Sequence, residues 1–136
     1  MSVPGVVVAV DVGTVRVGVA ASDPRRVLAS PVETVAAPGY ERVVEIVAER
    51  EAVLVLVGLP RSLSGRASSA SADMARDYAA ELEQRLDVPV LLQDERLTTV
   101  EAAHALRASG KRGKAARGVV DQAAAVALLQ GFLDRG

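Results

Sequence analysis

The 136-residue sequence has no cysteine, no tryptophan and a single histidine. Without cysteine the chain can form no disulfide framework, no thiolate metal site and no cysteine nucleophile. One histidine is too few for a histidine-based zinc cluster. Any metal ion bound by this protein would therefore have to be held by oxygen ligands.

Long hydrophobic runs and an excess of one charge are also missing. No segment approaches the roughly 18 uncharged apolar residues of a membrane helix, and the N-terminus lacks a basic segment followed by an apolar signal core. We therefore expect a soluble, non-secreted protein with no membrane partner. Sixteen Lys and Arg against seventeen Asp and Glu give a net charge of −1. This balance argues against a protein that coats nucleic acid by bulk electrostatics.

Apolar residues make up half of the chain, enough to bury a core, and the length predicts one domain over residues 1–136. Five segments have strand patterns, and the first two flank Gly13 as a β-hairpin would. The fourth is apolar without alternation, which predicts a central strand covered on both faces. The predicted strands are residues 6–12, 14–21, 27–34, 53–57 and 88–93.

Helical spacing or capping marks four further segments. The last of them is apolar on nearly every side, so we expect it to be packed into the core. A serine-rich stretch, Arg61–Ala72, predicts a loop. The order of strands and helices predicts an α/β fold with a mixed sheet. The predicted helices are residues 40–47, 74–86, 98–108 and 119–133.

Asp11 is a lone carboxylate inside the first predicted strand. Burying an ionised carboxylate costs several kcal/mol or more unless a cation or hydrogen-bond donors meet it. A metal ion, an Arg or Lys, or backbone N–H groups of the turn at Gly13 could do so. An Asp before Gly commonly caps a tight turn. That alternative stays open, although the apolar neighbours of Asp11 favour a functional role.

Three acidic residues lie where a strand or helix leaves the predicted core: Asp11, Glu95 and Asp121. Ligands gather at such strand ends in α/β proteins. Converging carboxylates raise one another's pKa unless a cation joins them, and Mg²⁺ suits oxygen ligands. Two such ions would stabilise the attacking and leaving oxygens of phosphodiester hydrolysis. These three residues are therefore the predicted metal ligands and catalytic residues.

Two of these assignments have open alternatives. Asp94 and Glu95 should point to opposite faces of their strand, so only one of them faces the site, and the sequence does not choose between them. Asp121 lies near a helix N-terminus, where a carboxylate complements the helix dipole without any catalytic purpose.

A basic segment precedes Asp121. Residues 102–120 contain no acidic residue, and their cations suit the phosphate backbone of a nucleic acid, although an ordinary solvated loop would have the same composition. Aromatic residues are only 2% of the chain, too few to stack unpaired bases, which favours readout of backbone and shape. The predicted nucleic-acid contacts are Arg16, Arg61, Lys111, Arg112, Lys114 and Arg117, with His104, Arg107 and Arg66 nearby.

Four blocks of sequence, spread over nearly the whole chain, resemble the YqgF (RuvX) family. They are residues 11–20 (DVGTVRVGVA), 58–60 (GLP), 94–99 (DERLTT) and 119–125 (VVDQAAA). The resemblance implies a ribonuclease H-like fold with a mixed five-stranded sheet flanked by helices. It also implies a cytoplasmic bacterial protein that processes the 5′ end of precursor 16S ribosomal RNA, with the ribosome as a partner. Asp11, Glu95 and Asp121 match the family's acidic site.

One position departs from the family pattern, which usually has Asn after the GLP block where this chain has Ser62. Because the side chain of Ser62 is shorter, the resemblance does not extend to a substrate contact by that loop. The family is also described as resembling Holliday-junction resolvases. RNA and branched DNA therefore both stay open as substrates, as do monomer and homodimer.

The preferred hypothesis is a metal-dependent endonuclease, using Mg²⁺ or Mn²⁺, that acts on structured nucleic acid. Two alternatives belong to other classes. The hairpin from Asp11 to Gly18 also resembles the phosphate-binding hairpin of the actin, sugar-kinase and heat-shock ATPase group, whose members bind nucleotide between two such domains. The other alternative is a non-catalytic nucleic-acid or ribosome-assembly factor.

Overall fold

The computed structural model describes residues 5–60, 70–94 and 114–135. In these ranges the chain forms five strands and three helices, with strands and helices alternating after an initial run of three strands. The elements are β1 (Val7–Val12), β2 (Arg16–Ser22), β3 (Ala29–Ala36), α1 (Tyr40–Glu49), β4 (Leu54–Leu59), α2 (Ala70–Arg85), β5 (Val90–Asp94) and α4 (Lys114–Arg135).

The five strands form one mixed sheet in the order β3-β2-β1-β4-β5. β1, β2 and β3 are antiparallel neighbours, as expected for strands joined by short turns. β4 pairs parallel with β1, and β5 pairs parallel with β4, as helical crossovers require. The mixed five-stranded sheet predicted from the sequence is confirmed.

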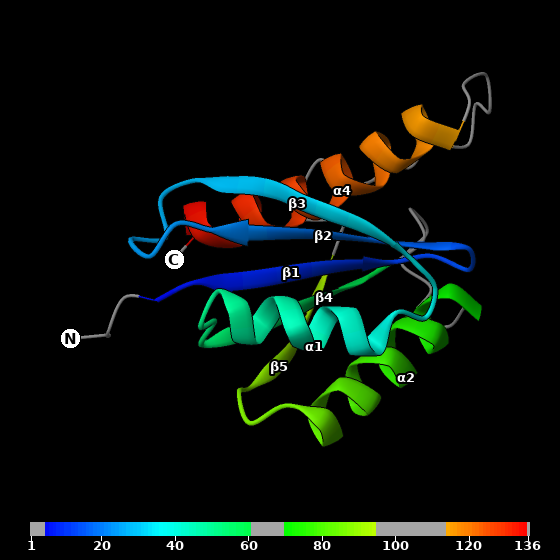
Figure 1. Cartoon of the computed structure of the whole chain (residues 1–136), viewed down its shortest axis with the longest axis horizontal. Coiled ribbons are helices and arrows are strands. Elements are labelled where there is room, and N and C mark those ends of the chain that lie inside the picture. The colour runs from blue at the N-terminus through cyan, green and yellow to red at the C-terminus, as the bar shows by residue number, and fades with distance from the viewer. Residues whose placement is uncertain (1–4, 61–69, 95–113, 136) are drawn as a thin grey trace.

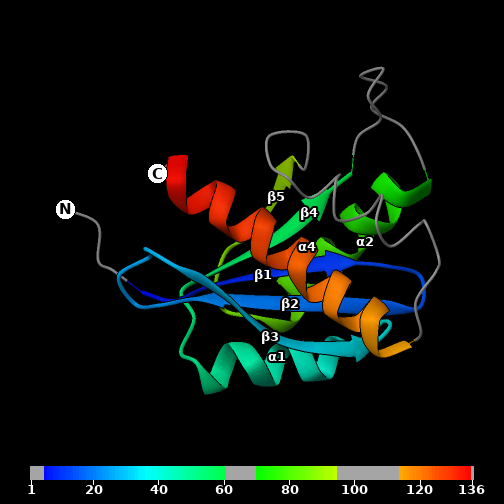
Figure 2. The same cartoon turned by 90° about the horizontal axis from the view of Figure 1, so that it is seen from above.

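Helices cover both faces of the sheet (Figure 1). α1 and α2 pack on one face, where side chains such as Val8, Val10 and Val17 are fully buried. α4 crosses the other face diagonally over β1, β2 and β3, and buries Val7 and Ala9 (Figure 2). Successive residues of β1 thus alternate between the two faces, which fixes the face on which every later side chain of the strand lies.

β4 confirms the prediction of a central strand. Val55 and Val57 pack toward α1 and α2, while Leu56 packs toward α4, and all three are fully buried. Burying side chains of this size stabilises the fold by about 1.5–3 kcal/mol each. The strand also continues through Gly58 and Leu59, two residues beyond the apolar run that predicted it.

The last helix differs from its prediction at its start. α4 begins at Lys114 rather than near residue 119, so Lys114 and Arg117 lie on a helix and not in a loop. Its expected packing into the core is confirmed by Ala124 and Leu128, which are fully buried, but over residues 122–135 the helix buries one side only, and Ala123 is exposed. Small alanines made the sequence look apolar all round, but an exposed Ala costs little, because it has little apolar surface.

Two other predictions concern the segments between strands. α2 begins at Ala70, inside the stretch predicted as a loop. The helix predicted at residues 98–108 lies outside the described residues. In the parts of the chain that are described, no helix combines the length and hydropathy needed to cross a bilayer.

Candidate active site

Asp11 is a buried carboxylate near the end of β1, with a side chain 1% exposed. Because Val7 and Ala9 face α4, strand alternation places Asp11 on the α4 face as well. Among the described residues the only other buried polar side chain is Ser22, whose hydroxyl accepts a hydrogen bond from the Val7 amide and donates one to the Asp23 carbonyl. Ser22 therefore has a structural role, and Asp11 is the buried charged group.

The strands on both sides of Asp11 present glycine beside it. Gly18 of β2 is its antiparallel partner. On the other side, the parallel pairing of β1 with β4 includes Val10 with Val57. The next residues of the two strands, Asp11 and Gly58, therefore lie side by side. Neither neighbouring strand therefore places a side chain beside the carboxylate. Glycine in a strand interior is typical of a place where a ligand or another backbone approaches closely.

The residues in register with Asp11 extend to both edges of the sheet. Gly18 pairs with Thr34 of β3, and Gly58 pairs with Gln93 of β5. We call this set the Asp11 row: Thr34, Gly18, Asp11, Gly58 and Gln93.

α4 is held over one end of the Asp11 row. The Gln122 amide donates a hydrogen bond of 3.0 Å to the Thr34 hydroxyl. Two turns later, Gln130 accepts from the Ala29 amide and donates to the Val27 carbonyl. α4 therefore runs antiparallel to β3, with its first turns beyond Thr34 and at the same end of the sheet as Asp11 (Figure 2). The backbone of Asp121, which precedes Gln122, lies at the level of the row, while side chains 114–121 lie outside the described part.

The register of β5 bears on the choice between Asp94 and Glu95. Asp94 pairs with Leu59, which packs toward α1 and α2, so Asp94 lies on the face opposite to Asp11. Glu95 is outside the described residues.

The basic residues are only partly described. Arg16 is the first residue of β2 and lies on the α4 face, two residues from Gly18. Lys114 and Arg117 lie on the first turns of α4. The other predicted contacts, Arg61, Lys111 and Arg112, fall outside the described ranges. The structure thus brings Asp11, Arg16 and the start of α4 to one end and one face of the sheet.

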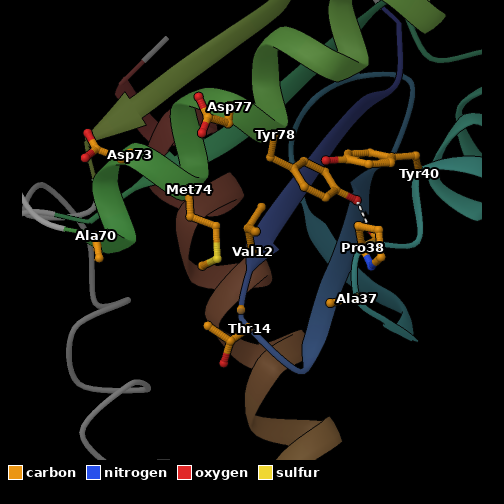
Figure 3. Close-up of a pocket in the computed structure, with 11 residues that line it drawn as sticks. Val12, Thr14, Ala37, Pro38, Tyr40, Ala70, Asp73, Met74, Asp77 and Tyr78 are labelled. Atoms are coloured by element: carbon orange, nitrogen blue, oxygen red, sulfur yellow. Dashed lines mark hydrogen bonds between the residues drawn. The ribbon is translucent and has the colours of Figure 1, made fainter.

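A cavity of about 540 Å³, which the sequence did not predict, lies on the opposite face of the same sheet end (Figure 3). Val12, Thr14, Tyr40 and Met74 line it, and Tyr78 closes one side with its hydroxyl donating to the Pro38 carbonyl. The sequence predicts helices over Tyr40, Met74 and Tyr78 and gives no sign that they line a cavity. Asp73 and Asp77 are the charged groups among its described lining residues.

A divalent cation suits the chemistry of this site. Asp11 offers a hard carboxylate oxygen in a position where an ionised group requires a cation or hydrogen-bond donors. The described residues contain no group of three potential ligands of the His, Cys, Asp or Glu types. Two of the three predicted ligand side chains, those of Glu95 and Asp121, lie outside that part of the chain, so the ligand set stays a prediction.

Comparison with known proteins identifies relatives along the whole described chain. The family profile described as "RuvX: Holliday junction resolvase" matches residues 5–135. A Rhodococcus opacus protein is 52% identical over 93% of this chain and 76% of its own length. A Nocardia farcinica protein is 53% identical over 92% of this chain and 75% of its own length. Both carry the name "Putative pre-16S rRNA nuclease".

Solved structures of low sequence identity share the fold. Thermus thermophilus RuvC, solved in complex with a Holliday junction substrate, superposes with a TM-score of 0.57 at 20% identity, covering 96% of this chain and 95% of its own. A second RuvC structure from that organism gives a TM-score of 0.55 at 19% identity and the same coverage. The predicted ribonuclease H-like fold is thereby confirmed, and the chain belongs to the RuvX family.

Proposed function

We propose that this protein is a divalent-metal-dependent endonuclease that hydrolyses phosphodiester bonds of structured nucleic acid, with the 5′ end of precursor 16S ribosomal RNA as its substrate. The names of the relatives support the substrate class. The observation that carries the proposal is the buried Asp11 carboxylate between two glycine-bearing strands, at the end of the sheet where α4 begins. We also propose that this activity takes place in the cytoplasm, as the family resemblance implies.

In this proposal Asp11, Glu95 and Asp121 hold Mg²⁺ or Mn²⁺. The bound cation supplies Lewis-acid polarisation of the phosphate and of the attacking water. Asp11 acts from a rigid strand interior, so its carboxylate is held in one place before the substrate arrives. Gly18 and Gly58 leave the sheet surface beside it without side chains. Burial of Asp11 excludes water and strengthens its electrostatic interactions.

The cations around the site would bind the nucleic-acid backbone. Arg16 lies on the Asp11 face, and Lys114 and Arg117 lie on the first turns of α4. We propose that these three residues, with Arg61, Lys111 and Arg112, contact phosphates flanking the cleaved bond. Contacts of this kind fix position rather than sequence, which suits a structured substrate.

The test compares cleavage of a ribosomal RNA precursor and of a synthetic four-way DNA junction, each with Mg²⁺, with Mn²⁺ and with a chelator. We expect wild-type protein to cut the RNA precursor only with a metal present, and Asp11→Asn to remove cleavage. Asp87→Asn, at an exposed carboxylate between α2 and β5, is the matched control and should cut normally. A thermal melt should show that Mg²⁺ raises the Tm of wild type and not of Asp11→Asn.

Each contrary result has a specific meaning. Undiminished cleavage by Asp11→Asn would refute the assignment of Asp11 to the catalytic site. Cleavage of the junction alone would replace the RNA substrate by branched DNA. Tight binding of both nucleic acids without cleavage of either would favour a non-catalytic binding factor.

A further inference from the structure

Gln93 lies on the same face as Asp11, at the far end of the Asp11 row. It is in register with Gly58 on β4, and Leu91, two residues earlier, pairs with Leu56 of the α4 core. Gly58 is the residue between Asp11 and Gln93 and has no side chain. The two strands that carry Asp11 and Gln93 are therefore two strand spacings apart, about 10 Å, with bare backbone between them.

The Gln93 side-chain nitrogen is buried and has no hydrogen-bond partner in the described part of the chain. No other side-chain nitrogen or oxygen of the described residues is in this state. An unpaired buried donor destabilises a protein, and each such group in a native fold calls for an explanation. β4 cannot supply an acceptor side chain, because the neighbour in register is glycine.

The chemistry of the missing partner follows from the atom. A side-chain amide nitrogen donates two hydrogen bonds and accepts none, so it suits an anionic oxygen and not a cation. A phosphate between Asp11 and Gln93 presents non-bridging oxygens of this kind, and their negative charge grows as the phosphorus is attacked.

We propose that Gln93 binds the phosphate at which cleavage occurs, its amide nitrogen donating a hydrogen bond to a non-bridging oxygen. The identity of the ligand rests on the proposed nuclease function. Gln93 holds the phosphate from β5, and Asp11 acts on it from β1, with the backbone of Gly58 on β4 between them. In the free protein the unpaired donor lowers stability, but it places the amide where the phosphate binds before substrate arrives.

Gln93→Met tests the proposal, because methionine has a similar length and no donor. We expect kcat/KM for cleavage to fall about tenfold, while the Tm of the free protein stays level or rises because a buried unpaired donor has been removed. Gln130→Met is the matched control. Its amide is fully used by Ala29, Val27 and Asp134 at the distant end of α4, so we expect a lower Tm and unchanged cleavage at a temperature where it is folded.

Sulfur substitution of the non-bridging oxygens at the cleaved phosphate locates the contact. One of the two phosphorothioate diastereomers should slow wild type more than it slows Gln93→Met, since the variant has no donor to lose. Equal effects on both proteins would overturn the proposal. A lower Tm with unchanged kcat/KM in Gln93→Met would also overturn it and assign Gln93 to the structure alone.

Binding in chelator separates this inference from the nuclease function. If wild type binds the RNA precursor in chelator but cuts nothing when Mg²⁺ or Mn²⁺ is supplied, the proposed function fails, and a severalfold weaker binding by Gln93→Met in chelator would still establish the phosphate contact. Equal binding by the two proteins in that case would overturn the contact as well.

Discussion

Asp11 of β1 and Gly18 of β2 are direct partners in the antiparallel register of the first hairpin, and both lie on the face covered by α4. A glycine in a strand interior costs roughly 0.5–1 kcal/mol relative to alanine. At Gly18 this cost leaves β2 without a side chain at the position paired with a buried carboxylate. The pair therefore joins a local destabilisation to the candidate metal site.

Adding a side chain at Gly18 should separate stability from activity. Gly18→Val places a branched side chain beside Asp11, and we expect cleavage to fall at least about tenfold, together with a smaller rise of Tm on adding Mg²⁺. Without metal the Tm should be level or higher, because valine favours strands. Gly18→Ala should be intermediate in both measurements. Wild-type cleavage by Gly18→Val would show that the site does not use this space.

The two glutamines of α4 should have different effects on function. Gln122 bonds Thr34 in the Asp11 row, and Gln130 bonds β3 at the opposite end. Each replacement by alanine should lower the free energy of unfolding by about 0.5–1.5 kcal/mol. Gln122→Ala should also lower cleavage severalfold, because it loosens the helix turn next to Asp121, whereas Gln130→Ala should cut normally. Equal loss of cleavage in both variants would mean that general stability, not the position of α4, limits activity.

The sequence was sufficient to identify Asp11 as a candidate functional residue, because a charged side chain in an apolar strand has few explanations. The sequence could not choose between Asp94 and Glu95. Strand alternation puts them on opposite faces of the sheet but does not show which of them shares the face of Asp11. The pairing of Asp94 with Leu59 places Asp94 on the face opposite to Asp11, whereas Glu95 lies outside the described residues and its role stays a prediction. Gln93 carried no signal at all in the sequence. A glutamine is ordinary in an edge strand, and only the tertiary structure shows that its nitrogen is buried without a partner.

The β1–β2 turn should depend on Gly13 for steric reasons. The Gly13 amide donates to the Arg16 carbonyl, and a Cβ at Gly13 would lie 2.6 Å from that same carbonyl oxygen. Because the clash is with backbone, the hairpin must shift to accept alanine. We expect Gly13→Ala to lower the free energy of unfolding by about 1–3 kcal/mol, measured by urea denaturation. An unchanged midpoint would mean that the turn can relax at no cost.

The ion pair between β3 and α1 predicts part of the acid sensitivity of the fold. Arg42 donates to both oxygens of the Glu33 carboxylate, from Nη2 to Oε1 at 2.8 Å and from Nε to Oε2 and Oε1 at 2.9 and 3.1 Å. These bonds, and then the charge of the guanidinium, hold the pKa of Glu33 below its ordinary value. The folded state therefore gains stability from the ionised carboxylate above the ordinary pKa of about 4.3, and loses this gain as the pH falls through the lowered pKa.

Replacing Glu33 by glutamine should remove this contribution to the acid limb. We expect Glu33→Gln to be less stable than wild type at pH 7 and to approach it as the pH falls below about 4. Glu83→Gln, at an exposed position on α2, controls for the loss of one carboxylate. The measurement is the urea midpoint of the three proteins between pH 3 and pH 7. Parallel curves for wild type and Glu33→Gln would show that the Arg42 contact does not persist in solution, since an intact contact must make their separation depend on pH.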